Sequence, residues 1–89
     1  MKRITTGSRF RKDVKLAQRR GMDMSKLVAL IEMLAAGKPL PERCRDHPLK
    51  GEFANFRDCH IEPDWLLIYA TTKEDLKLVR TGTHGDLFR

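Results

Sequence analysis

Several features of membrane-spanning, secreted or disulfide-stabilised proteins are missing from this sequence of 89 residues. No uncharged apolar segment approaches the roughly 18–20 residues that a membrane-spanning helix needs. The basic N-terminal residues are not followed by the apolar region of a signal peptide. The only two cysteines, Cys44 and Cys59, lack the spacing of metal ligands, so we expect reduced thiols. These absences together predict a soluble domain in the cytoplasm.

Acidic residues are scarce at the N-terminus. The first twenty residues contain eight basic side chains against Asp13 alone, a net charge of +7 in a chain whose total is +6. The excess positive charge is therefore confined to one end. Such a patch attracts a polyanion by releasing its condensed counterions, and it speeds the encounter. A nucleic acid, an acidic protein or merely a solvated helix face would each account for it.

The hydrophobic content of 40% is enough for one globular domain with one core. The N-terminal half has the periodicity of helices. Residues 2–6 are expected to form a short strand, followed by a helix from Ser8, its expected N-cap, to Arg20. Gly21 suits the C′ position of this helix.

A second helix is expected to begin at a cap formed by Asp23 or Ser25 and to end at Gly37. Its apolar residues recur at helical spacing, which is more typical of a core face than of a cofactor site. Because few residues separate the two helices, we expect them to form an antiparallel hairpin.

After Pro41 the periodicity changes to that of strands, at residues 53–61, 65–70 and 76–81. The run WLLIYA at 65–70 carries no charge, which indicates burial on both faces and a central position in the sheet. The order β-α-α-β-β-β predicts an α+β fold: a mostly antiparallel sheet with the helical hairpin on one face.

The three histidines, His47, His60 and His84, fall at or near ends of the expected strands. Asp64 precedes the central strand, and Arg80 lies near the end of the last one. Because meandering antiparallel strands bring alternate ends together, we expect these five side chains to converge on one edge of the sheet. For each histidine taken alone, a structural or merely exposed role is the alternative.

Two imidazoles can divide into a neutral base and a protonated acid at physiological pH, and a guanidinium fits a phosphate. This set suits metal-independent cleavage of an RNA phosphodiester by its own 2′-OH. Trp65 and Phe88 are candidates for stacking a base, although core packing is the alternative for Trp65. The His and Asp spacing matches no compact metal-binding motif, so no metal or other cofactor is expected.

Three segments, taken together, carry a resemblance to a known family: DHPLKG, FRDCHIEPDWLLIY and LVRTGTHGDLF. In this order and near these spacings they look like the YafQ-type branch of the RelE/ParE toxin superfamily, and the resemblance spans essentially the whole chain. It implies a RelE-like microbial ribonuclease fold. It also implies a ribosome-dependent mRNA endoribonuclease, the toxin of a type II toxin–antitoxin pair, which cleaves codons in the ribosomal A site and is neutralised by a cognate antitoxin protein.

The resemblance also implies functional roles for seven positions: His47, His60, Asp64, Trp65, Arg80, His84 and Phe88. His84 would be the general acid, and His47 the base or the group that orients the 2′-OH. Asp64 would be an alternative base or the partner that sets an imidazole's tautomer.

Of the other four positions, His60 and Arg80 would also be catalytic, and Trp65 and Phe88 would bind the substrate. His60 would support or contact the phosphate, Arg80 would stabilise the pentacovalent phosphate, and Trp65 and Phe88 would hold the nucleotide. The basic first helix would dock on ribosomal RNA, with an acidic antitoxin segment competing for part of that surface. Its docking residues would be Arg9, Arg11, Lys12, Lys15, Arg19 and Arg20.

Two other function classes remain open from the sequence. One is a non-catalytic ParE-like toxin that binds a protein such as DNA gyrase, although that activity does not need the histidines. The other is a nucleic-acid-binding module or autorepressor, which would explain the N-terminal charge but would leave the three histidines without a role.

Overall fold

In the computed structural model, which describes residues 1–88, five strands form one mixed sheet in the order β1-β5-β4-β3-β2. The strands are β1 (Arg3–Thr6), β2 (His47–Pro48), β3 (Arg57–Glu62), β4 (Trp65–Thr71) and β5 (Asp75–Gly82). β1 pairs with β5 in parallel, and every other pairing is antiparallel. The uncharged run of β4 lies at the centre of the sheet, which confirms the position predicted for it.

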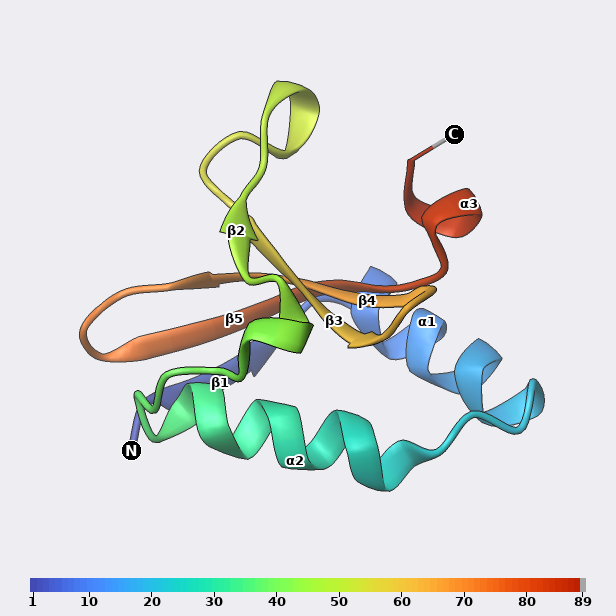
Figure 1. The fold of residues 1–89 in the computed structure, drawn as a ribbon, viewed down its shortest axis with the longest axis horizontal. Helices are drawn as coiled ribbons and strands as arrows, with labels where there is room; N and C mark the ends of the chain where they lie inside the picture. Colours follow the sequence, from blue (N-terminus) through green and yellow to red (C-terminus); the bar gives the residue numbers. More distant parts are fainter. Residues whose placement is uncertain (89) are drawn as a thin grey trace.

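Three α-helices and two 3₁₀ turns complete the fold: α1 (Ser8–Arg19), α2 (Met24–Ala35), α3 (His84–Leu87), η1 (Glu42–Cys44) and η2 (Gly51–Phe53). α1 and α2 lie on one side of the sheet, with α1 packed mainly against β5 (Figure 1). The loop that carries β2 and η2 rises on the other side, as does α3. The predicted α+β class is confirmed. Within residues 1–88 no helix is both long and apolar enough to cross a bilayer.

The helix caps confirm two predictions and correct two others. Gly7, rather than Ser8, is the N-cap of α1, and no side chain caps that end. Asp23 caps α2 by accepting a hydrogen bond from the Ser25 backbone N–H at 3.0 Å. Gly21 follows α1 with a φ of +75°, a conformation that glycine adopts without steric cost. α2 itself ends at Ala35, two residues before the predicted end at Gly37.

The first predicted strand of the C-terminal half begins later than expected. Residues 51–53 form the 3₁₀ turn η2, and β3 starts only at Arg57. Gly51 and Asn55 have positive φ angles of 69° and 79°, which interrupt an extended backbone. The short elements β2 and α3 were not predicted.

A β-bulge changes the predicted alternation in β5. Leu78 pairs with Tyr69 and Arg80 pairs with Ile68, so Val79 is an extra residue between two consecutive positions of β4. Alternation alone places Arg80 on the face of Leu78. The bulge instead moves Arg80 to the register of Ile68, on the opposite face.

Apolar side chains cover both faces of β4. Trp65, Leu67 and Tyr69 pack with buried residues of α1 and α2. Leu66 and Ile68 pack on the other face with buried Leu87 and with partly buried side chains of the β2–β3 region and β5. Burial on both faces explains why this strand has no charged residue. The second face also carries the candidate active site.

Trp65 belongs to the first of these cores, so its predicted role in stacking a nucleotide is wrong. Its exposed fraction is 1%, and its indole N–H donates to the Thr81 hydroxyl at 3.0 Å. The Thr81 hydroxyl in turn donates to the Leu66 carbonyl at 2.7 Å. A ring enclosed in this way has no free face for a base.

Trp65→Phe is expected to lower the free energy of unfolding by about 1–2 kcal/mol, because the Thr81 hydroxyl loses a buried donor. Chemical denaturation of Trp65→Phe, Thr81→Val and the double variant measures this. The double variant should lose less than the sum of the two single losses. Strict additivity would show that the bond between the two side chains contributes nothing.

Candidate active site

The strand pairing brings the histidines of β3 and α3 together. His60 pairs with Leu66, and Leu66 pairs with Gly82 on its other side, so the chain that follows Gly82 emerges beside His60. α3 begins two residues later with His84. The two imidazole rings meet edge to face, with centroids 5.5 Å apart. Two of the predicted histidines therefore converge.

Asp64 holds the imidazole of His84. One carboxylate oxygen lies 2.6 Å from the ring Nδ1 and also accepts the His84 backbone N–H at 2.9 Å. These two hydrogen bonds, the backbone one foremost, lower the pKa of Asp64 below its ordinary value. An ionised carboxylate can only accept, so Nδ1 carries the hydrogen. This leaves Nε2 as the ring nitrogen that is available to exchange a proton with a ligand.

His47 reaches the same face from β2, where it pairs with Asp58. Its Nδ1 lies 2.6 Å from the backbone carbonyl of Arg45. A carbonyl only accepts, so Nδ1–H is the donor and Nε2 is the free ring nitrogen. The half-exposed His47 ring therefore offers a basic nitrogen to a ligand on this face.

Asp58 is a member of this site that sequence analysis did not assign. Its exposed fraction is 3%, and one carboxylate oxygen lies 3.2 Å from Nδ1 of His47. That oxygen is buried and receives no hydrogen bond from the described residues. Burial raises the pKa of Asp58, and the three nearby imidazoles oppose the rise. The available signal was the strand alternation, which places Asp58 on the face of Phe56 and His60.

The surroundings of His60 favour its neutral form. Burial lowers the pKa of His60, and the positive charges of His84 and Arg45 lower it further, while Asp58 opposes them. Near pH 7 the His60 ring is therefore mainly neutral. Three imidazoles thus lie close enough to one buried carboxyl group for their charges to act on it.

Phe88 lies beside the imidazoles with part of its ring free. It is 42% exposed, packs edge-on against Phe53 at a centroid distance of 5.8 Å and lies 6.4 Å from the His84 ring. Phe53 lies in turn next to Phe56. Such a partly exposed ring is suited to stacking with an unpaired base.

Arg80 is held by α1 rather than by the histidines. Its guanidinium donates two hydrogen bonds to the carboxylate of Asp13, at 2.6 and 3.1 Å. The Thr81 backbone N–H also donates to this carboxylate. The Arg80 and Asp13 side chains are only 15% and 12% exposed. The bulge places Arg80 opposite Ile68, on the face that carries the imidazoles. Its charge, however, is paired with Asp13 of α1.

Short-range contacts fix α3 in place. The Thr83 hydroxyl accepts the Asp86 N–H, and the Asp86 carboxylate accepts the Thr83 N–H at 2.9 Å. Arg20 of the turn after α1 binds the same carboxylate through two nitrogens, at 2.7 and 3.2 Å. A Cβ atom on Gly82 would lie 2.9 Å from an Asp86 oxygen. The orientation of His84 thus depends on a tightly packed turn.

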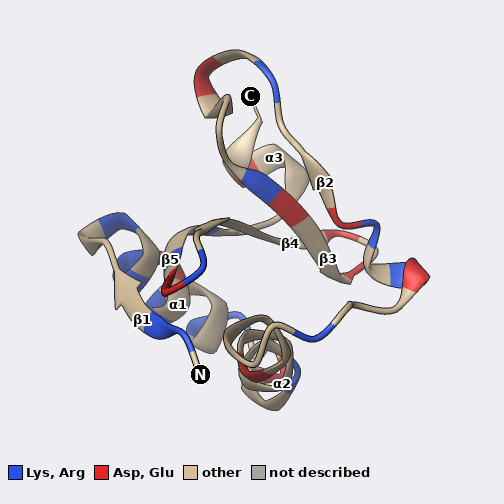
Figure 2. Cartoon of the chain, turned by 90° about the vertical axis from the view of Figure 1, so that its left-hand side faces the viewer, with Lys and Arg blue, Asp and Glu red and all other residues tan. Residues whose placement is uncertain are grey.

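The six basic residues predicted to dock on RNA are all exposed. Lys and Arg colour the start of β1 and several parts of the neighbouring α1, so the charge excess of the sequence forms one region in space (Figure 2). Arg20 joins this region to α3 through its ion pair with Asp86. Within residues 1–88, no group of three or more His, Cys, Asp or Glu side chains is arranged to hold a metal ion.

Comparison with known proteins shows the same family over the full fold. Residues 2–89 match the family described as "Bacterial toxin of type II toxin-antitoxin system, YafQ". The mRNA interferase toxin YafQ of Escherichia coli K12 is 49% identical over 86 residues, which are 96% of this chain and 94% of that protein.

Two crystal structures extend this similarity to the backbone. The chain is similar to YafQ from E. coli BL21(DE3), with a TM-score of 0.94, 46% identity and complete coverage of both chains. It is also similar to YafQ in the E. coli DinJ–YafQ toxin–antitoxin complex, with a TM-score of 0.92 and 47% identity over 99% of this chain and 98% of that one.

Proposed function

The chain belongs to the YafQ family of bacterial type II toxin–antitoxin toxins, and from this premise we propose that it is an endoribonuclease that cleaves mRNA in the ribosomal A site. The observation that carries the proposal is the cluster of three imidazoles on one face of the sheet, in which His60 meets His84 and His47 lies beside buried Asp58. A toxin that acted only by binding a protein would not need this cluster.

The cluster accounts for each proton in the reaction. A neutral imidazole removes the proton of the 2′-OH, and the 2′-oxygen attacks the adjacent phosphorus. The bond from phosphorus to the 5′-oxygen breaks, and an imidazolium protonates that oxygen. The products are a 2′,3′-cyclic phosphate and a 5′-hydroxyl, and no metal ion takes part.

We assign the acid to His84 and the base to His47. Each has its Nδ1 engaged by an acceptor, Asp64 or the Arg45 carbonyl, and so offers Nε2 to the substrate. The bond to His84 makes Asp64 the group that sets a tautomer rather than the base. Neutral His60, beside His84, contacts the phosphate. Phe88 stacks on a base of the codon.

Arg11, Lys12 and Lys15 contribute to docking on ribosomal RNA. Replacing all three with glutamine should weaken ribosome binding and reduce the slope of log affinity against log salt by roughly 2–3, because each lost phosphate contact removes about 0.7–0.9. Binding titrations over a series of salt concentrations measure the slope. A matched control replaces three other exposed lysines, Lys38, Lys73 and Lys77. Equal slopes for the two triple variants would contradict docking through α1.

A cognate antitoxin is the expected protein partner, because a structural relative is a YafQ chain in complex with DinJ. An acidic antitoxin segment would compete with RNA for the basic surface of α1. Toxin, antitoxin and ribosome would meet in the cytoplasm.

Induction of the wild type and His84→Ala in growing cells, followed by mapping of mRNA ends, tests the function. Cleavage in register with codons by the wild type, lost in the variant, is the expected result. Growth arrest with intact mRNA and damaged DNA would identify a ParE-like toxin instead. Absence of arrest with either protein would favour a binding module.

A further inference from the structure

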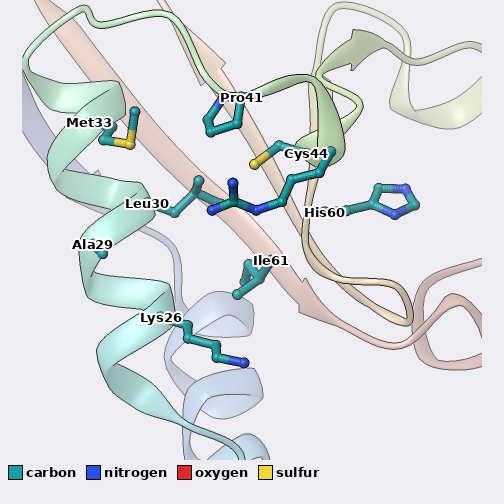
Figure 3. A pocket seen from close by; sticks show the side chains of 9 residues that line it. Lys26, Ala29, Leu30, Met33, Pro41, Cys44, His60 and Ile61 are labelled. Atoms are coloured by element: carbon teal, nitrogen blue, oxygen red, sulfur yellow. The ribbon is translucent and has the colours of Figure 1, made fainter.

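Beside the imidazole cluster lies a groove that no role yet explains. It has a volume of about 430 Å³ and is lined by Arg43, Arg45, His60, Ile61, Glu62 and Pro63. A second cavity of about 290 Å³, between α2 and β3, shares Arg43, His60 and Ile61 with it. The His60 ring points away from α2, while Leu30 and Met33 line the α2 side of this cavity (Figure 3). His60 therefore connects the groove to the imidazoles.

The groove offers guanidinium groups that are not engaged elsewhere. Arg43 and Arg45 are exposed, and neither side chain forms an ion pair or hydrogen bond with the described residues. Five other arginine side chains are bonded to protein oxygens: Arg3, Arg11, Arg20, Arg57 and Arg80. Glu62, the acidic residue of the groove, is neutralised by Lys26 at 2.6 Å. The groove thus has a net positive charge.

The backbone of Arg45 is hydrogen-bonded to His47 of the candidate active site. Arg45 has a φ of 47°, a left-handed conformation that is uncommon for a residue other than glycine. Its carbonyl accepts the hydrogen bond from His47. The same residue that sets the tautomer of His47 therefore places a guanidinium close enough to His60 to affect its ionisation. Strained residues of this kind are typical of ligand sites.

We propose that Arg43 and Arg45 bind the mRNA backbone at a phosphate that flanks the scissile one. This inference rests on the proposed function, because the scissile phosphate must lie among the imidazoles. A strand whose scissile phosphate lies there continues past His60 into the groove. A guanidinium fork matches phosphate oxygens, and an unpaired arginine gives up no existing ion pair to bind them. An acidic peptide shares the charge but not the need to adjoin the imidazoles.

The test is single-turnover cleavage of mRNA on programmed ribosomes by the double variant Arg43→Gln/Arg45→Gln. The matched control is Lys38→Gln/Lys73→Gln, which removes two exposed basic side chains outside both the groove and α1. Charge-assisted hydrogen bonds predict a loss of roughly tenfold to a hundredfold in rate over half-saturating concentration for the first pair. The control pair should lose less, and thermal unfolding should show both variants to be folded.

Substitution of single phosphates by neutral methylphosphonates locates the contact. The wild type should lose activity at one flanking phosphate, and the groove variant should be insensitive at that same position. Equal sensitivity of the two proteins at every flanking phosphate would overturn the proposal. Normal cleavage by the groove variant with impaired inhibition by antitoxin would overturn it too, and would assign the groove to an acidic peptide. If the wild type itself does not cleave, the proposed function fails first, and the subsite fails with it.

Discussion

His84→Ala should lower the single-turnover rate of mRNA cleavage about 10²- to 10⁴-fold, the range for loss of a general acid. The leaving 5′-oxygen would depart without a proton, because the neighbouring His60 is mainly neutral near pH 7. The rate is measured with saturating toxin on ribosomes that carry the codon in the A site, so that docking does not limit it. A loss smaller than tenfold would remove His84 from the acid role.

Asp64→Asn provides the matched control for this variant. The amide oxygen can still accept the Nδ1–H of His84, so the ring keeps its orientation while the negative charge is lost. We expect a smaller loss than for His84→Ala. If Asp64→Asn were the more damaging change, Asp64 rather than an imidazole would be the group that transfers the proton.

Arg80→Ala is expected to lower the cleavage rate by roughly two to three orders of magnitude, as removal of one transition-state donor does elsewhere. The pairing with Asp13 adds a structural alternative, because the change also leaves a largely buried carboxylate unpaired. The rate is therefore measured well below the unfolding temperature of the variant and expressed per folded molecule.

Asp13→Asn separates the two roles of Arg80. If Arg80 acts on the phosphate, freeing its guanidinium from the carboxylate should leave cleavage intact or faster, although the protein becomes less stable. If Arg80 only joins α1 to β5, the Asp13 and Arg80 variants should lose stability and activity in parallel. Near-normal cleavage by Arg80→Ala would refute its role at the phosphate.

Long periodic segments were predictable from the sequence, because their pattern repeats often enough to fix both type and position. The central strand β4 and the two helices are the examples. Residues 53–56 were wrongly predicted as the start of a strand, because they run directly into the alternating segment that follows. The positive φ angles of Gly51 and Asn55 decide that segment instead.

The candidate site was predictable in composition but only partly in geometry. The convergence of His60, His84 and Asp64 follows from strand order. The orientation of Trp65 could not be predicted, because the sequence of a strand buried on both faces does not indicate which face packs against the helices. The position of Arg80 depends on the bulge at Val79, and no glycine or other turn residue in the sequence indicates this bulge.

Because Gly82 and Asp86 fit closely, a single missense mutation at Gly82 is expected to inactivate this toxin. Any missense change in that codon adds a Cβ atom that would displace Asp86, and with it the turn that carries His84, the proposed general acid. The core that α1 and α2 cover lies on the other face of the sheet. We therefore expect cells that carry the gene without its antitoxin to survive through such changes, which should give a folded protein that no longer cleaves mRNA and still binds the antitoxin.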